Sequence, residues 1–61
     1  MKSYVNQVKR YVVYGTNKSW RVATLERAMK VVEMEIRKNF RMSIFEDNKE
    51  IAFYENEKRV F

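Results

Sequence analysis

The chain has 61 residues, of which 46% are hydrophobic and 34% are charged, and its net charge is +5. A chain of this length forms one domain, expected to span residues 1–61, and buries only about 60% of the surface that its unfolded state exposes. It contains neither cysteine nor histidine, which excludes a disulfide and argues against a zinc site. Association with a second copy or with a partner is the remaining way to stabilise so small a core.

The excess positive charge lies in the first half of the chain. Residues 1–30 hold seven Lys or Arg and one acid, whereas residues 31–61 hold six bases and seven acids. Such asymmetry steers a negatively charged partner to one side of a molecule. No stretch has the pattern of a secretory signal or of a membrane span, so a cytoplasmic protein is expected. The frequent Lys, Asn, Ile, Phe and Tyr residues have AT-rich codons, which favours an origin in a phage or mobile element.

Two short strands are predicted at the start of the chain. Residues 9–14, KRYVVY, are rich in β-branched and aromatic side chains, and Gly15 interrupts the pattern. Residues 19–23, SWRVA, form the second strand of a hairpin. An alternative reading starts the helix near Ser19 and removes this second strand.

The clearest predicted element is a helix within residues 24–40. Apolar residues recur there at steps of three and four, which is the period of one helix face. Thr24 is the expected N-cap, because its hydroxyl can accept a hydrogen bond from the first turn. The stripe comprises Leu25, Ala28, Met29, Val32, Ile36 and Phe40. Acid–base pairs at i,i+4 spacing support the exposed side: Glu26 with Lys30, and Glu33 with Arg37.

A second hairpin is predicted after the helix. Residues 41–45 and 51–54 alternate in the manner of strands, and the polar residues 46–50 between them have turn composition. Asn48 tolerates the backbone angles that tight turns require. The predicted fold class is therefore α+β, with a single helix on one face of a small antiparallel sheet of three or four strands, in the order ββαββ or, without the second strand, βαββ.

Alternation assigns the side chains to two faces of this sheet. A two-residue turn at Thr16 and Asn17 pairs Val13 with Trp20 and Tyr11 with Val22, and these four face the helix, together with Met42, Ile44, Ile51 and Phe53. The residues expected to be buried together are Leu25, Met29, Val32, Ile36, Ile44 and Phe53. Those expected on the outer face are Arg10, Val12, Tyr14, Arg21, Arg41, Ser43, Phe45, Ala52 and Tyr54.

The predicted outer face combines aromatic rings with arginines, the residues that dominate binding hot spots. The predicted partner-binding residues are Arg10, Tyr14, Arg21, Arg41, Phe45 and Tyr54. This pattern favours a non-catalytic regulator that occludes a surface of a larger protein with an acidic patch.

Two alternatives use the same face. Rings among bases also suit single-stranded DNA or RNA, whose bases stack on aromatic side chains, although no nucleic-acid motif appears in the chain. A homodimer that buries the outer face is the third hypothesis.

Catalysis is not expected. The chain lacks the side chains and the glycine-rich loop that general acid–base, nucleophilic or phosphate chemistry uses most often, and no cofactor is predicted. The acids Glu46, Asp47 and Glu50 lack the spacing of a calcium loop, so a solvated turn is the preferred interpretation.

Overall fold

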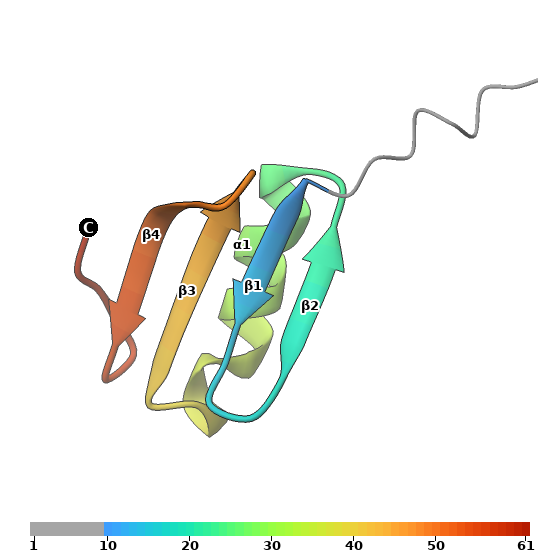
Figure 1. Cartoon of the computed structure of the whole chain (residues 1–61). Helices are drawn as coiled ribbons and strands as arrows, with labels where there is room; N and C mark the ends of the chain where they lie inside the picture. Colours follow the sequence, from blue (N-terminus) through green and yellow to red (C-terminus); the bar gives the residue numbers. More distant parts are fainter. Residues whose placement is uncertain (1–9) are drawn as a thin grey trace, which may run out of the picture.

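The computed structural model of the chain describes residues 10–61, and within them one helix packs on one face of a five-stranded antiparallel sheet (Figure 1). The strands lie in the order β2-β1-β3-β4-β5. The elements are β1 (Tyr11–Tyr14), β2 (Ser19–Val22), α1 (Leu25–Glu35), the 3-10 turn η2 (Ile36–Lys38), β3 (Arg41–Glu46), β4 (Lys49–Glu55) and β5 (Lys58–Arg59). The α+β class is confirmed. The strand at 19–22 excludes the βαββ alternative, and β5 adds one strand to the predicted order.

The N-terminal hairpin has the predicted register. Tyr11 pairs with Val22 and Val13 pairs with Trp20. The Gly15 amide donates to the Lys18 carbonyl at 2.7 Å, which closes the turn. Val13 is fully buried, because β1 lies between β2 and β3 and beneath the helix.

Helix α1 begins as predicted and ends early. The Thr24 hydroxyl accepts a hydrogen bond from the Arg27 amide at 3.2 Å. The α-helix stops at Glu35 and tightens into η2, so the prediction that Phe40 closes the apolar stripe is wrong. Phe40 instead precedes β3 and is 58% exposed. Asn39 lies between the two, with its Nδ2 donating to the Glu35 carbonyl at 2.8 Å.

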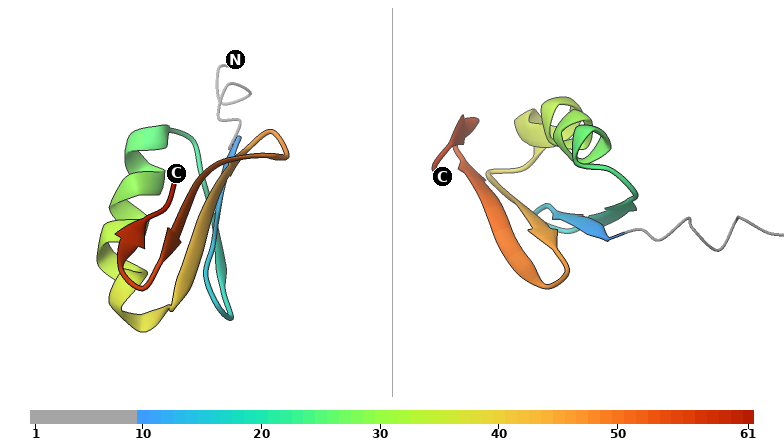
Figure 2. Two further views of the ribbon diagram at one scale, coloured as in Figure 1. Left: turned by 90° about the vertical axis from the view of Figure 1, so that its left-hand side faces the viewer. Right: turned by 90° about the horizontal axis from the view of Figure 1, so that it is seen from above.

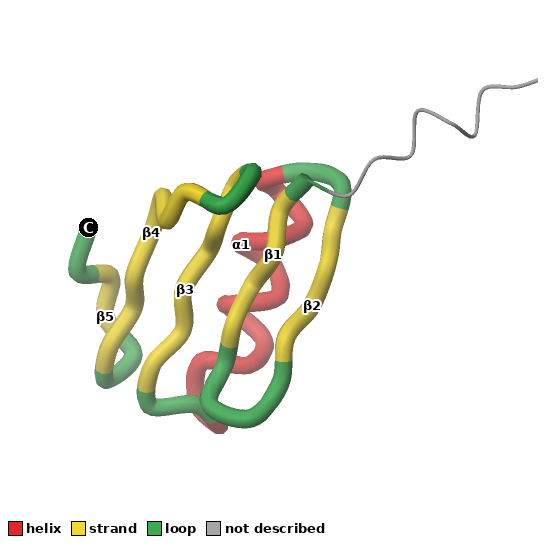
Figure 3. Tube along the Cα trace, viewed as in Figure 1, coloured by secondary structure: helices red, strands yellow, loops and turns green. Residues whose placement is uncertain are grey.

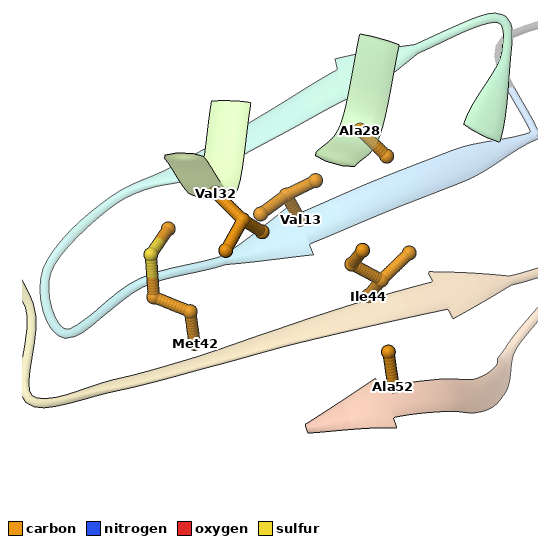
Figure 4. Packing of buried hydrophobic residues seen from close by; sticks show 6 residues of the cluster. All are labelled: Val13, Ala28, Val32, Met42, Ile44 and Ala52. Atoms are coloured by element: carbon orange, nitrogen blue, oxygen red, sulfur yellow. The ribbon is translucent and has the colours of Figure 1, made fainter. Parts of the chain in front are cut away.

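The helix meets the sheet through Ala28 and Val32, which are both buried. Leu25 and Met29 were predicted to be buried with Val32, and this is wrong, because they are 40% and 43% exposed. The physical reason is the position of the helix, which packs mainly on β1 and β2. Leu25 and Met29 lie to the side of the helix face that contacts these strands, so they stay partly exposed to solvent. Figure 4 shows the resulting core, which comprises Val13, Ala28, Val32, Met42, Ile44 and Ala52.

Two tight turns shape the C-terminal part of the sheet. Asp47 and Asn48 join β3 to β4 with φ values of 51° and 72°, the left-handed conformation of a type I′ hairpin turn. Asn56 and Glu57 repeat this conformation between β4 and β5, with φ values of 54° and 65°. The second turn creates the strand that the sequence reading missed, and the C-terminal end returns alongside β4 at that edge of the sheet (Figure 2).

A β-bulge changes the alternation of β4. Ile44 pairs with Ala52 whereas Phe45 pairs with Glu50, so Ile51 is the extra residue of β4. Ile51 and Ala52 therefore both pack with the core. The predicted outward direction of Ala52 is wrong. After the bulge, each residue of β4 points to the face opposite to the one predicted, so Ala52 and Tyr54 lie on the helix side and Phe53 on the outer side.

Candidate interaction surface

The face of the sheet opposite the helix carries an aromatic cluster. Val12 and Tyr14 of β1 alternate with the buried Val13 and so point away from the helix. Phe45 pairs with Val12, and Phe53 pairs with Ser43, which itself pairs with Tyr14. Directly paired residues share a face. We call this set, with the adjoining Phe61, the outer aromatic face: Val12, Tyr14, Phe45, Phe53 and Phe61.

The rings of the outer aromatic face contact one another in two pairs. Tyr14 and Phe45 meet edge to face with centroids 5.3 Å apart, and Phe53 and Phe61 lie 6.2 Å apart in a tilted arrangement. Ser43 stands between the two pairs, on the strand that separates β1 from β4. One ring of each pair is exposed, Tyr14 at 46% and Phe61 at 55%, whereas Phe45 and Phe53 are half-buried.

The position of Tyr54 is the main correction to the predicted site. Because of the bulge at Ile51, Tyr54 pairs with Met42 and packs against the core on the helix side. Phe53 takes its place on the outer face, so the expectation that Phe53 contacts the helix core is also wrong. The surface is therefore aromatic as predicted, but on β4 the ring comes from Phe53 and not from Tyr54.

The arginines of the predicted site are less available than the sequence implied. Arg41 Nε donates to Glu55 Oε2 at 3.1 Å, and Glu55 is its cross-strand partner. Arg10 lies 3.8 Å from Glu46 and 3.7 Å from Asp47. Both pairs are at the surface, where they stabilise the fold little but partly neutralise the cations.

Arg21 differs from these two arginines. It pairs with Val12 across β1 and β2, so it borders the outer aromatic face. Within residues 10–61 it forms no ion pair with a carboxylate. Of the six predicted contact residues, the structure therefore brings Tyr14, Arg21 and Phe45 together with their predicted character, while Arg10 and Arg41 lie at the rim with acidic partners.

Phe53 and Phe61 are the residues that the sequence reading missed. Phe61 is held beside β4 because its carbonyl accepts a hydrogen bond from the Phe53 amide at 3.4 Å and the Val60 amide donates to the Phe53 carbonyl at 2.7 Å. The Asn56–Glu57 turn makes this return possible. An Asn inside a polar pair after a strand is the one signal that pointed to it.

Glu46 at the end of β3 and Asp47 in the β3–β4 turn contact other parts of the fold. Glu46 accepts a hydrogen bond from the Tyr11 hydroxyl at 3.3 Å, in addition to its contact with Arg10. Among the residues described, 10–61, acidic side chains do not gather in a group of three that could hold a metal ion. None of the helices in this part of the chain is long and apolar enough to cross a membrane.

A groove on the helix side is a second surface feature. It has a volume of about 450 Å³ and lies between α1 and the β4–β5 end of the chain. Met29, Ile36 and Tyr54 provide its apolar lining, and charged residues including Glu33 and Glu57 stand around it. This groove is the space that the helix leaves uncovered.

No protein-family model, curated protein or solved structure matches this chain.

Proposed function

We propose that the protein is a small non-catalytic binding protein that occludes a surface of a larger protein through its outer aromatic face. The observation that carries this proposal is the gathering of four apolar side chains from three strands on the face that the helix does not cover, with the ring of Phe61 packed against that of Phe53. Isolated exposed aromatics are ordinary, whereas a contiguous cluster is typical of an interface.

The rings supply the binding free energy in this proposal. Aromatic side chains remove a large apolar area from water and lose few rotamers on binding, so one ring at the centre of an interface contributes about 2 kcal/mol or more. Phe45 and Phe53 flank Ser43 and are already half-buried, which holds them in place before the partner arrives. Arg21 at the border favours an acidic patch on the partner.

The alternative function is binding of single-stranded nucleic acid by the same face. The exposed Tyr14 ring beside Arg21 favours it, because a base can stack on the ring while the guanidinium meets a phosphate. The acidic partners of Arg10 and Arg41 disfavour it, since both carboxylates would lie next to the phosphates. We therefore place a protein partner first.

Paired substitutions test the proposal. The partner is isolated on the wild-type chain from an extract of the source organism, and its affinity is then compared for Phe45→Ala with Phe53→Ala and for Met34→Ala. Met34 is the matched control, because it is 67% exposed on the helix. We expect the double variant to bind about 100-fold more weakly and the control to bind within about twofold of wild type. Equal affinities would contradict the proposal.

Salt dependence separates the two functions. Each phosphate contacted on a single strand contributes a slope of about −0.7 in log affinity against log salt, so a contact by Arg21 alone gives about −0.7 and each further contact adds as much. Tight binding to random single-stranded oligonucleotides with such a slope, lost in the double variant, would establish the alternative. Sedimentation over a range of concentrations detects the third hypothesis, a homodimer, which the same double variant would dissociate.

A further inference from the structure

The open edge of the sheet at β2 has the properties of a site for an added strand. Among residues 10–61, β2 pairs with β1 on one side and is the last strand of the sheet on the other (Figure 3). Its pairing with β1 is regular over all four residues. The opposite edge is β5, which has two residues and follows a turn with two left-handed residues. Of the two edge strands, only β2 is long and regular enough to pair with an added strand.

The hydrogen-bonding groups of this edge can be assigned. Antiparallel pairs alternate between those that exchange two backbone hydrogen bonds and those that exchange none. Because the Gly15 amide bonds to the Lys18 carbonyl, the bonded pairs that follow are Val13–Trp20 and Tyr11–Val22. The hydrogen bond from the Asp47 amide to the Arg10 carbonyl agrees with this assignment. Since bonded pairs recur at every second residue, the backbone groups of Val12 and Tyr14 also face β3. The N–H and C=O of Ser19 and Arg21 therefore face the open edge.

The charge beside the edge is positive. A cavity of about 680 Å³ lies where β2 meets the helix, and Arg21, Arg27 and Lys30 line it together with Glu26. Within the described part of the chain, none of the three cations forms an ion pair. Lys18 lies at the other end of the strand, with its Nζ 5.6 Å from the centroid of the Trp20 ring.

This charge decides which strand fits. A second copy of β2 added about a two-fold axis at Trp20 would set the two Arg21 side chains diagonally opposite on one face, where like charges repel. A basic or neutral strand would leave the cations unpaired. We propose that β2 binds an extended acidic peptide segment as an added strand, with carboxylates meeting Arg21 on the outer face and Arg27 and Lys30 at the strand's end.

The added strand has a second requirement on the helix side. Trp20 and Val22 are half-buried and pack against the core on that face, so alternate residues of the peptide meet an apolar surface. The preferred ligand is therefore a strand in which acidic and apolar residues alternate. This inference rests on the proposed function only for the idea of an acidic protein partner, because it involves the edge of the sheet and not the outer aromatic face.

The probe is a blocked octapeptide of alternating glutamate and valine, added to the full-length chain and followed by amide NMR shifts and hydrogen exchange. We expect shifts and exchange protection at the Ser19 and Arg21 amides, and an affinity about tenfold above that of the matched lysine–valine octapeptide. Equal affinity for the two peptides, a stronger response to an oligothymidine, or shifts located away from β2 would each overturn the proposal.

Two kinds of variant test the contacts. Arg21→Glu with Arg27→Glu should weaken octapeptide binding about tenfold or more, whereas Arg37→Glu with Lys38→Glu, the same charge change in η2, should change it less than about twofold. Ser19→Pro removes an edge N–H that the fold does not use and should also weaken binding. Unchanged binding in the arginine variant would overturn the proposal even if the proline variant fails to fold.

The failure of this inference is distinguishable from failure of the proposed function. Phe45→Ala with Phe53→Ala should keep full octapeptide binding, because neither ring lies on β2. If that variant also keeps the protein partner, the proposed function falls while the edge site stands. If the octapeptide does not bind but the double variant loses the partner, the reverse holds.

Discussion

The N-terminal hairpin and the C-terminal pair β4–β5 differ in how the helix covers them. α1 packs on β1 and β2, and Val13 beneath it is fully buried. On β4 the buried residue is the small Ala52, and the helix-side space beyond it is an open groove. A helix is about 10 Å wide and strands lie about 4.8 Å apart, so one helix covers roughly two strands of a five-stranded sheet. The position of a single helix therefore decides which half becomes core.

The two regions also differ in charge. Lys18 and Arg21 of the first hairpin form no ion pair within residues 10–61, whereas the cations Arg10 and Arg41 each meet an acid of the β3–β4 hairpin. The first hairpin thus supplies cations that are unpaired within residues 10–61, and β3 and β4 supply two of the four rings of the outer aromatic face. A partner that binds both would need an apolar surface next to an acidic one.

The largest expected effect compares the same substitution in the two regions. Val13→Ala removes two methyl groups from a fully buried site and should lower the free energy of unfolding by about 2 to 3 kcal/mol. Val60→Ala acts on a residue that is 56% exposed beside β5 and should cost less than about 0.5 kcal/mol. Urea unfolding followed by Trp20 fluorescence measures both. Equal losses would mean that the C-terminal end is as well packed as the N-terminal hairpin.

The second largest effect on stability is expected where the first hairpin contacts the residue that follows η2. Asn39 Oδ1 accepts a hydrogen bond from the Thr16 amide at 2.9 Å, and a Cβ at Gly15 would lie only 2.7 Å from that oxygen. Gly15→Ala should therefore displace Asn39 and cost about 1 to 2 kcal/mol. In the background of Asn39→Ala the same change should cost clearly less, since the crowded atom is gone. Thermal unfolding of the four proteins tests this, and full additivity would show that the contact is not the cause.

The smallest expected effect is a gain in the C-terminal region. Glu57 has a φ of 65°, which is costly for a residue with a side chain. Glu57→Gly relieves this strain but increases the freedom of the unfolded chain, so the net stabilisation should be about 0.5 kcal/mol. Calorimetry should show a small rise in melting temperature, with Glu50→Gly in β4 as a control that lowers it. A fall for Glu57→Gly would indicate that β5 is held by contacts of the Glu57 side chain.

The sequence was a good guide where one local signal decided the structure. A two-residue turn placed at Thr16 and Asn17 was sufficient to predict the register of β1 and β2. The helix stripe was also real, but a stripe has two flanks, and periodicity does not tell whether the sheet lies nearer Ala28 or Met29. In the structure the sheet packs against the flank that carries Ala28, because its small side chain permits the helix to approach closely.

The sequence was a poor guide where pairing partners decided it. The bulge at Ile51 depends on how β3 and β4 meet, and alternation within β4 alone gives the opposite assignment for Phe53 and Tyr54. Likewise, the acids that neutralise Arg10 and Arg41 are more than ten residues away along the chain. The sequence therefore predicted that the candidate surface is aromatic and basic. It did not predict the rings of Phe53 and Phe61 or the ion pairs of Arg10 and Arg41, because these depend on tertiary contacts.

The central claim is that the outer aromatic face, and not the helix side, meets the partner. Phe53 and Tyr54 are neighbours in the chain on opposite faces of β4, which makes them a matched pair. A photoreactive phenylalanine analogue placed at each position in turn, and irradiated with the isolated partner, measures which face is in contact. We predict a crosslink from position 53 and little or none from position 54. Crosslinking from position 54 alone would contradict the claim and move the interface to the groove beside the helix.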